Sequence, residues 1–356
     1  MFEVDFLPVG DSNGDAICLR YGDPVSGFFH HVVDGGFKDT ADTIIKHIGE
    51  HYGASTVIDH MVLSHADNDH AVGLVGVMQH FKVKNLWMNR PWLYADQVID
   101  SFHGNFSLEG LIQDMRDRHS YLVELEELAV AQGTIVHQVF QGAQIGPFKV
   151  LSPEKQRYIS AIPDLDKTPT SYAKDESFGG LLTGVRTLVE KAKTWLEETW
   201  HLETLSENPG PTSVSNETSI VQYGQLGDKL VMLTADAGPT ALKEAVAYAL
   251  KIGMNKIPDM IQVPHHGSRR NVTPSVLDAL LGGKVAQGQE YGKAYCSIGK
   301  EEKDYPRGQV KNAFTRRGYP VRVTRGKPIY YFGDGAQMRP GWVPIMPEPF
   351  ATEVEA

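Results

Sequence analysis

Cysteine is scarce in this sequence: the 356 residues contain only Cys18 and Cys296, far apart along the chain. The chain therefore has no Cys-x-x-Cys metal site, and the spacing suggests no disulfide framework. Long apolar runs are also missing, since no stretch approaches the roughly 18 residues that a membrane-spanning helix needs. The start of the chain lacks the basic flank and apolar run of a signal peptide, so we expect a soluble cytoplasmic protein without a membrane partner.

Positive charge is in short supply as well, because 34 Lys and Arg face 44 Asp and Glu and leave a formal net charge of -10. A uniformly acidic surface repels nucleic acid, so any DNA or RNA binding must use a local basic patch. Hydrophobic residues make up 41% of the chain, which is enough for a large core, or for one large domain with an insertion.

Strand and helix patterns alternate in the first third of the sequence. Several short stretches are apolar or alternating like strands, at residues 3–9, 15–21, 30–36, 58–65 and 83–89. Residues 40–53 and 71–81 are predicted to be helices. The same rhythm returns later, with a hairpin at 218–236, a helix at 240–253 and further strands. These patterns predict an α/β fold, in which ligands bind at the carboxyl ends of strands.

The middle of the chain has a different character. Residues 106–132 and 176–205 are predicted to be helical, and apolar side chains share one face of the second segment. We interpret residues 155–213 as a helical insertion that forms a lid, with helices packed plainly on the core as the alternative. The insertion divides one domain into halves at 1–154 and 214–339. The Pro-rich, then acidic residues 340–356 are expected to form a loosely held tail.

The stretch LSHADNDHAVG packs two imidazoles and two carboxylates into six positions, at His65, Asp67, Asp69 and His70. Asp and His are poor helix and strand formers, so local structure does not explain the cluster. All four side chains can bind a metal ion, and this mixture of ligands suits zinc or manganese.

Two further polar clusters follow apolar strands later in the chain. VMLTAD ends in Asp236, and IQVPHHG contains the pair His265 and His266. Since strand ends of an α/β fold converge on one edge, Asp236 and one of these histidines can join the first four residues. Such a set is large enough for two divalent ions that share a bridging carboxylate. Two ions would lower the pKa of bound water and hold both oxygens of a displacement.

Together these motifs resemble the metallo-β-lactamase fold family, and most closely the soluble domain of the ComEC-type DNA-uptake proteins. HADNDH is similar to the family's His-x-His-x-Asp-His motif, with Asp in the second His position as in the ComEC branch. Other pieces that resemble this branch are PVGDSNGDAI, VVDGG, SNETSIVQY, LTADAG, VPHHGS and the strand-helix-strand at 294–329. The resemblance covers nearly the whole chain outside 155–213 and the tail. It implies an αββα sandwich with a two-metal site along one edge.

The resemblance also implies a role for each candidate residue. The metal ligands would be His65, Asp67, Asp69, His70, Asp236 and His266, with Asp236 as the bridge. His266 is favoured over His265 because a Gly-Ser follows it, as in related phosphodiesterases. Asp34 would hold the loop of the first His motif by hydrogen bonds. The candidate catalytic residues are Asp69, His265 and Arg270, and His265 would contact the substrate.

Two departures from the family pattern affect the expected metals and the substrate contacts. The wider family has another His ligand after the strand at 83–89, and this chain has Asn89 there. One of the two zinc or manganese positions is therefore expected to be weak or empty. The Tyr-Gly-His-Pro of the ComEC branch is replaced by KDYP, which removes a His from the region of substrate contacts.

The expected substrate is a phosphodiester, in a nucleic acid or a nucleotide, attacked by a metal-bound hydroxide. Residues 299–327 contain nine Lys or Arg against three acidic residues, and Arg269 and Arg270 stand beside the His pair. Bases would be able to stack on three aromatic side chains, Trp87, Trp92 and Tyr94. A solvated basic face and ordinary core aromatics are the plain alternatives. The other functions that fit are a hydrolase of small esters, lactones or thioesters, and a catalytically weak metal-binding regulatory module.

Overall fold

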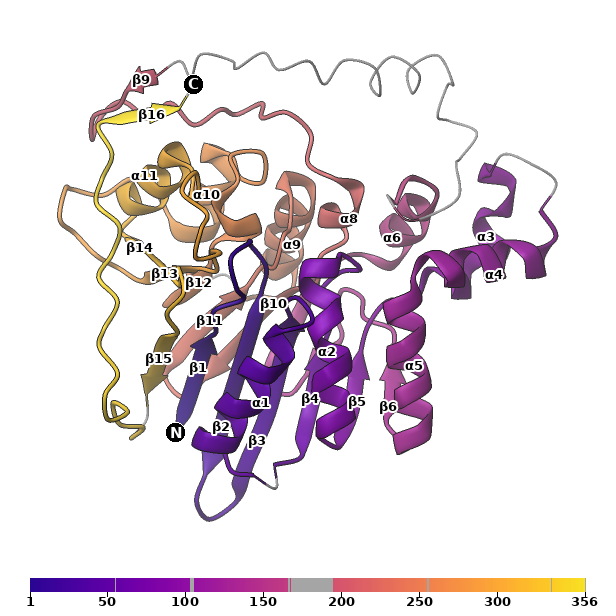
Figure 1. The fold of residues 1–356 in the computed structure, drawn as a ribbon. Coiled ribbons are helices and arrows are strands. Elements are labelled where there is room, and N and C mark those ends of the chain that lie inside the picture. Colours follow the sequence, from indigo (N-terminus) through magenta and orange to yellow (C-terminus); the bar gives the residue numbers. More distant parts are fainter. Residues whose placement is uncertain are drawn as a thin grey trace.

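Two seven-stranded sheets form the centre of the fold (Figure 1). The computed structural model describes residues 1–54, 56–102, 106–165, 167, 195–254, 256–333 and 335–355. Within these ranges no helix is both long and apolar enough to span a membrane. The first sheet has the order β15 (Ile329–Gly333), β1 (Phe2–Phe6), β2 (Ala16–Asp23), β3 (Gly27–Gly35), β4 (Ile58–Val62), β5 (Val83–Trp87), β6 (Ile135–His137). Strands β3 to β6 run parallel, and the other neighbours are antiparallel.

The second sheet combines a parallel half with an antiparallel half. Its order is β14 (Val321–Val323), β13 (Lys293–Cys296), β12 (Met260–Gln262), β11 (Lys229–Leu233), β10 (Val221–Leu226), β8 (Phe148–Ser152), β7 (Gln144–Ile145). Strands β11 to β14 are parallel. Strands β10 and β11 form the predicted hairpin, with Leu226 opposite Lys229.

Helices cover the outer face of each sheet, and a shared apolar layer fills the space between the sheets (Figure 1). One core joins the first sheet to α1 (Thr40–His51), α2 (Asn68–His80), α4 (Leu108–Arg118) and α5 (Ser120–Gln132). Another joins the second sheet to α9 (Pro239–Lys251), α10 (Pro274–Leu281) and α11 (Gly308–Arg316). In β4, Met61 packs beneath the helices while Val62 faces the second sheet, as the alternation of side chains along a strand requires. The four layers form the αββα sandwich that the sequence predicted.

A close contact between two glycines sets the position of α2 on the first sheet. A Cβ atom on Gly73 would lie 1.9 Å from the carbonyl oxygen of Gly35, and one on Gly35 would lie 2.3 Å from the amide nitrogen of Leu74. Only glycine permits this approach of helix to strand. As a result, the second turn of α2 lies against the end of β3, where Asp34 is located.

The predictions for the middle of the chain are confirmed in part. The helical region at 106–132 exists as α4 and α5, which meet at His119. Residues 155–165 form α6 (Lys155–Ala161) and a 3-10 turn whose apolar side chains join the first core. Most of the predicted helix at 176–205 lies outside the described residues. At Trp195–Glu197, however, the chain forms strand β9, so the helix prediction is wrong there, and the lid role of 155–213 stays a prediction.

The C-terminal residues are packed on the fold, which contradicts the expected loosely held tail. Strand β16 (Glu353–Glu355) pairs with β9, and Val354 is fully buried between its neighbours. Before this strand, Asn312 donates a hydrogen bond to the carbonyl oxygen of Ala351, and Arg325 pairs with Glu348 at 3.0 Å. The pairing partner of this tail lies more than 150 residues away, which local composition does not reveal.

Candidate metal centre

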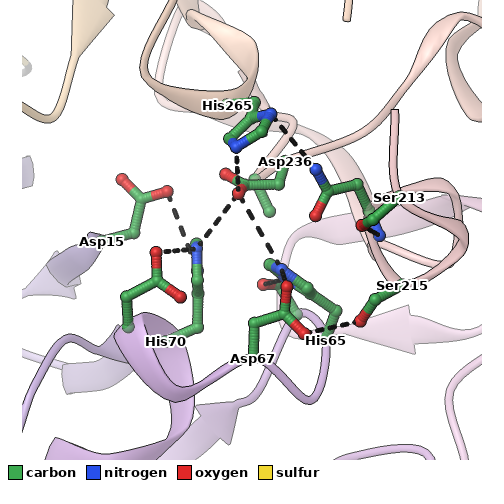
Figure 2. Close-up of polar contacts among 12 residues, drawn as sticks. Asp15, His65, Asp67, His70, Ser213, Ser215, Asp236 and His265 are labelled. Carbon is green, nitrogen blue, oxygen red and sulfur yellow. Dashed lines mark hydrogen bonds and ion pairs between the residues drawn. The ribbon is translucent and has the colours of Figure 1, made fainter. Parts of the chain in front are cut away.

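The ends of β4, β11 and β12 bring the predicted site residues together at one edge of the sandwich (Figure 2). The loop after β4 carries His65 and Asp67, and the first turn of α2 carries Asp69 and His70. The loop after β11 supplies Asp236, and the loop after β12 supplies His265 and His266. The parallel strands are the reason for this convergence, because their carboxyl ends lie on the same side.

The Asp236 carboxylate is the centre of the cluster. Its Oδ2 atom lies 3.5 Å from Nε2 of His70, 3.9 Å from Nε2 of His65 and 3.5 Å from Nε2 of His265. Its Oδ1 atom lies 3.7 Å from Nε2 of His266. We call His65, Asp67 and Asp236 the first position, and Asp69, His70 and His266 with the same Asp236 the second position. A carboxylate that faces donors of both positions has the geometry of a bridge.

The spacing of these atoms fits a bound ion better than it fits hydrogen bonds. Distances of 3.5–3.9 Å exceed the usual hydrogen-bond range. A tetrahedral ion with bonds of about 2.0–2.2 Å holds its ligand atoms about 3.3–3.6 Å apart. In addition, four buried atoms find no hydrogen-bond partner in the described part of the chain: Nε2 of His65, His70 and His266, and Oδ1 of Asp236. Because a buried polar atom without a partner is unfavourable, the residues present fit a metal ion.

Hydrogen bonds at the opposite ring nitrogens fix the histidines in the tautomer that binds metal. His70 Nδ1 lies 2.8 Å from Asp34 Oδ2, and His266 Nδ1 lies 2.9 Å from the carbonyl oxygen of Ser297. Both partners are acceptors, so each Nδ1 carries the proton. His65 Nδ1 lies 3.0 Å from Ser64 Oγ, whose own hydrogen is donated to Asp34 Oδ2 at 2.7 Å. The Nε2 lone pairs of all three rings therefore face the cluster.

Asp34 has the role that the sequence assigned to it, as the residue that holds the His loop. Besides its contacts with His70 and the Ser64 hydroxyl, its Oδ1 accepts a hydrogen bond of 2.8 Å from the backbone N–H of Ser64. Its backbone is in the left-handed region, with φ of 57°. Ala235, His265 and His266 also have positive φ, at 45°, 46° and 55°. Backbone strain of this kind persists only where surrounding structure enforces it, and here it is concentrated at the metal centre.

Asp15 is a site residue that the sequence reasoning missed. It belongs to a compact group with His70, Asp236 and His266, in which one ligand atom from each residue lies within 4.8 Å of the others. Gln262 donates a hydrogen bond of 2.9 Å to Asp15 Oδ2, while the buried Oδ1 has no partner among the described residues. The motif PVGDSNGDAI was noted as a family-like hairpin, and its final Asp was the available signal. Asp15 adds a carboxylate to the second position.

The electrostatics of the cluster favour bound positive charge. Burial alone would lower the pKa of His266, but the Asp236 and Asp69 carboxylates reverse this effect and raise it to about 9. Burial likewise opposes ionisation of Asp236, yet the imidazoles of His265, His70 and His266 hold its pKa well below its usual range. In a metal-free chain, protons on the imidazoles balance the negative charge of the carboxylates. When the histidines are neutral, a divalent cation balances that charge instead.

Asn89 does not supply an amide oxygen to the first position. Its Oδ1 accepts a hydrogen bond of 2.7 Å from the backbone N–H of Val139, and its Nδ2 donates one of 2.8 Å to the carbonyl oxygen of the same residue. Both ends of the amide are thus used to join two chain segments. Asn89 is therefore turned toward Val139 and does not replace the His ligand that the family pattern has at this point.

The aromatic residues near the site do not form a surface for stacking bases. Trp92 and Tyr94 are buried in the first core, at 4% and 7% exposure. Trp87 stacks on the ring of His137 at 4.0 Å and donates a hydrogen bond to Nδ1 of His60. These side chains are core residues, so the base-stacking interpretation is wrong.

A polar cleft of about 500 Å³ opens beside the metal centre. Carboxylates from both positions line it, and so do three arginines, Arg269, Arg270 and Arg307. Arg269 and Arg270 are exposed and follow the loop that carries the His pair. Thr212 and Asn216 line the cleft from the segment before β10. Positive charge is therefore present at this cleft, as the sequence predicted for Arg269 and Arg270.

The basic stretch at 299–327 contributes less to the cleft than its composition suggested. Of its nine cations, only Arg307 lines the cleft within the described structure. Arg316 and Arg317 are fully buried, where they pair with Glu198 at 3.1 Å and Glu203 at 2.8 Å. Buried pairs of this kind join α11 to the segment after β9, so most of the predicted phosphate-binding patch is wrong.

Neither the family models nor the curated proteins gave a match to the sequence. Solved structures that match include a metallo-beta-lactamase candidate from Thermotoga maritima, with a TM-score of 0.35 and 9% identity, covering 73% of this chain and 94% of that chain. The metallo-beta-lactamase SMB-1 matches with a TM-score of 0.31 and 13% identity, covering 78% and 86%. The CmlA beta-hydroxylase matches with a TM-score of 0.35 and 13% identity, covering 83% and 45%. The activities named for these proteins differ, so the function has to be argued from this chain's own site.

Proposed function

We propose that this chain is a metal-dependent hydrolase of phosphodiesters. The hydrolase part rests on the buried, unpartnered donor atoms of the two positions. The choice of substrate rests on one observation: Arg269, Arg270 and Arg307 line the same cleft as Asp67, Asp69 and Asp236. A cytoplasmic location and a nucleotide or nucleic-acid substrate belong to the same proposal.

The balance of charge explains why the arginines matter. The two positions contain four carboxylates, those of Asp15, Asp67, Asp69 and Asp236, which two divalent ions would neutralise. The metal centre would then offer little net attraction to an anion. Arginines beside it restore that attraction and can donate paired hydrogen bonds to phosphate oxygens. A neutral lactone or thioester gains little from such residues.

Bound divalent ions would supply an activated water and hold the oxygens of the displacement. The chain's own residues would do the rest. Arg270 would bind a phosphate oxygen on which negative charge grows in the transition state. The Asp69 carboxylate, whose side chain is 29% exposed at the cleft, would accept a proton there. Ser215 donates a hydrogen bond of 2.7 Å to Asp67 Oδ1, which turns Oδ2 toward the first position.

The test compares substrate classes and one arginine. The metal-free chain would be reloaded with Mn²⁺ or Zn²⁺ and assayed on bis(4-nitrophenyl) phosphate, a lactam, a thioester and a lactone. We expect the phosphodiester to turn over fastest. Arg270→Ala should lower its kcat/KM by about 10–100-fold, since a hydrogen bond to a charged group contributes about 1.5–3 kcal/mol.

The matched control is Lys46→Ala, which removes a cation that is 75% exposed on α1 and lies outside the cleft lining. Its activity should equal that of the wild type, and the metal content should stay unchanged in both variants. Lactonase or thioesterase activity that exceeds phosphodiesterase activity and ignores Arg270→Ala would favour the ester hydrolase. No turnover of any substrate by a metal-loaded chain would favour the regulatory module.

A further inference from the structure

The first position has a gap in its ligand set. His65, Asp67 and Asp236 face it, and the Asn89 amide is occupied by Val139. We infer that His265 is the remaining protein ligand of the first position, so that the two adjacent histidines bind different ions. This inference rests on the proposed metal centre and departs from the substrate-contact role that the sequence gave to His265.

The orientation of Asn271 is the starting point. Its Nδ2 donates a hydrogen bond of 2.8 Å to the carbonyl oxygen of Asp236, and the carbonyl of Ala237 lies 3.5 Å away. Carbonyl oxygens only accept, so the nitrogen end of this amide must face them. Asn271 is fully buried, which leaves its amide little freedom to turn.

The fixed amide in turn determines the tautomer of His265. Asn271 Oδ1 lies 2.9 Å from His265 Nδ1, and an amide oxygen only accepts, so Nδ1 carries the proton. The Asn216 amide lies 3.1 Å from the same ring nitrogen, with its other contact, at 2.9 Å, to the Thr212 hydroxyl. Both contacts are made by Asn216 Nδ2. Turning this amide presents Oδ1 to both partners, and the Thr212 hydroxyl then donates to Asn216 in place of its 3.3 Å bond to Asn271 Oδ1. In the neutral ring, the Nε2 atom of His265 is therefore the unprotonated nitrogen.

That nitrogen points at a carboxylate oxygen. His265 Nε2 lies 3.5 Å from Asp236 Oδ2, and Figure 2 shows the Asp236 carboxylate between His265 and His65. A lone pair facing a buried anionic oxygen is repulsive unless a proton or a metal ion lies between them. His65 Nε2 faces the same oxygen from 3.9 Å. His65, His265 and Asp236 are therefore the residues that would hold a cation at this oxygen, which His70 Nε2 also faces from 3.5 Å.

The backbone explains how two neighbouring residues serve two positions. His265 and His266 both have positive φ, at 46° and 55°, and the N–H of His265 is held by the carbonyl oxygen of Ala235 at 3.1 Å. This unusual conformation sends the His266 side chain to Ser297 and the second position, and the His265 side chain to Asn271 and the first. With His265 included, the first position has two imidazoles and two carboxylates, and the expectation that one position is weak or empty no longer follows.

The test is a titration of the metal-free, full-length chain with Mn²⁺. Stoichiometry is measured by equilibrium dialysis, and electron paramagnetic resonance distinguishes a coupled Mn²⁺ pair from an isolated ion. His265→Asn is the main variant, because Asn tolerates a positive φ better than most residues and its neutral amide oxygen is a weaker ligand than imidazole. His265→Ala is the second variant, and the exposed His80→Asn is the control.

We expect two ions and a coupled signal in the wild type and in His80→Asn. Both His265 variants should bind one ion normally, show the signal of isolated Mn²⁺, and bind the other at least about 100-fold more weakly. Asn271→Ala should weaken the same ion by about 10–100-fold, as is typical when the partner of a ligating histidine is removed. Two ions bound with wild-type affinity in the His265 variants would overturn this inference and leave the proposed function standing. A wild-type chain that binds no ion would overturn both.

Discussion

The substitution Asp34→Asn should reverse the tautomers of two ligating histidines at once. Asp34 Oδ2 accepts hydrogen bonds from His70 Nδ1 at 2.8 Å and from the Ser64 hydroxyl at 2.7 Å. In the variant, an NH₂ group takes the place of Oδ2 while the remaining oxygen keeps the bond to the Ser64 backbone N–H. The NH₂ group would donate to His70 Nδ1, and the His70 proton would move to Nε2. The Ser64 hydroxyl would then donate to His65 Nδ1, with the same result for His65.

The expected magnitude follows from the number of ligands affected. His65 belongs to the first position and His70 to the second, so both ions should be weakened. Loss of a correct partner for a ligating histidine lowers metal affinity by about 10–100-fold, or about 1.4–2.8 kcal/mol for each ion. The metal-free chain should keep its stability to within about 1–2 kcal/mol, since Asn matches Asp in shape and suits the left-handed backbone at φ of 57°.

The assay is a competition titration with a chromogenic chelator, with thermal unfolding of the metal-free proteins alongside. Asp59→Asn is the matched control, because Asp59 is also nearly buried and also accepts a backbone N–H, from His30 at 2.9 Å, but lies at the other end of β4. Wild-type affinity for both ions in Asp34→Asn would refute the tautomer argument. Equal weakening in Asp59→Asn would show that the loss is not specific to the site.

Three further predictions concern packing, pH and the missed carboxylate. Gly73→Ala should destabilise the chain by about 1–3 kcal/mol in urea unfolding, because the added Cβ meets the Gly35 carbonyl oxygen. Gly49→Ala on α1, whose added Cβ meets nothing within 4 Å, should instead stabilise the chain by about 0.5–1 kcal/mol. Equal effects of the two substitutions would contradict the close-contact argument. Burial, and to a lesser extent the neighbouring His60, lowers the pKa of His31 well below 6.5 in the folded state. Below pH 6.5 only the unfolded chain gains this proton, so the stability of the fold decreases as the pH is lowered. His31→Phe should remove up to about 1.4 kcal/mol of that loss per pH unit in the metal-free chain, and identical losses between pH 7 and pH 5 would contradict this. Asp15→Asn should weaken the ion of the second position, measured by the same competition titration, and an unchanged affinity would exclude Asp15 as a ligand.

Much of the site was predictable because it follows strand ends. His65, Asp236 and His266 each come a few residues after a parallel strand, and parallel strands bring such residues together whatever their separation in sequence. Asp15 was missed for a related reason. It precedes an antiparallel strand and sits in a Gly- and Asp-rich stretch, where an Asp is explained equally well as a turn residue.

The features that sequence reasoning predicted wrongly depend on distant partners. Arg316 and Arg317 look like surface cations until Glu198 and Glu203 are seen beside them. Strand β9 exists because β16 pairs with it, although its apolar spacing suggested a helix. In each case the deciding interaction joins segments more than 100 residues apart, which local patterns do not encode.

The most direct test of the central claim is the metal content of the chain purified without chelator and then equilibrated with Mn²⁺ or Zn²⁺. The account predicts about two divalent ions per wild-type chain. It also predicts that Asp236→Asn weakens both ions, since this carboxylate faces donors of both positions. A folded wild-type chain that binds no divalent ion, or an Asp236→Asn variant with unchanged metal content and affinity, would contradict it.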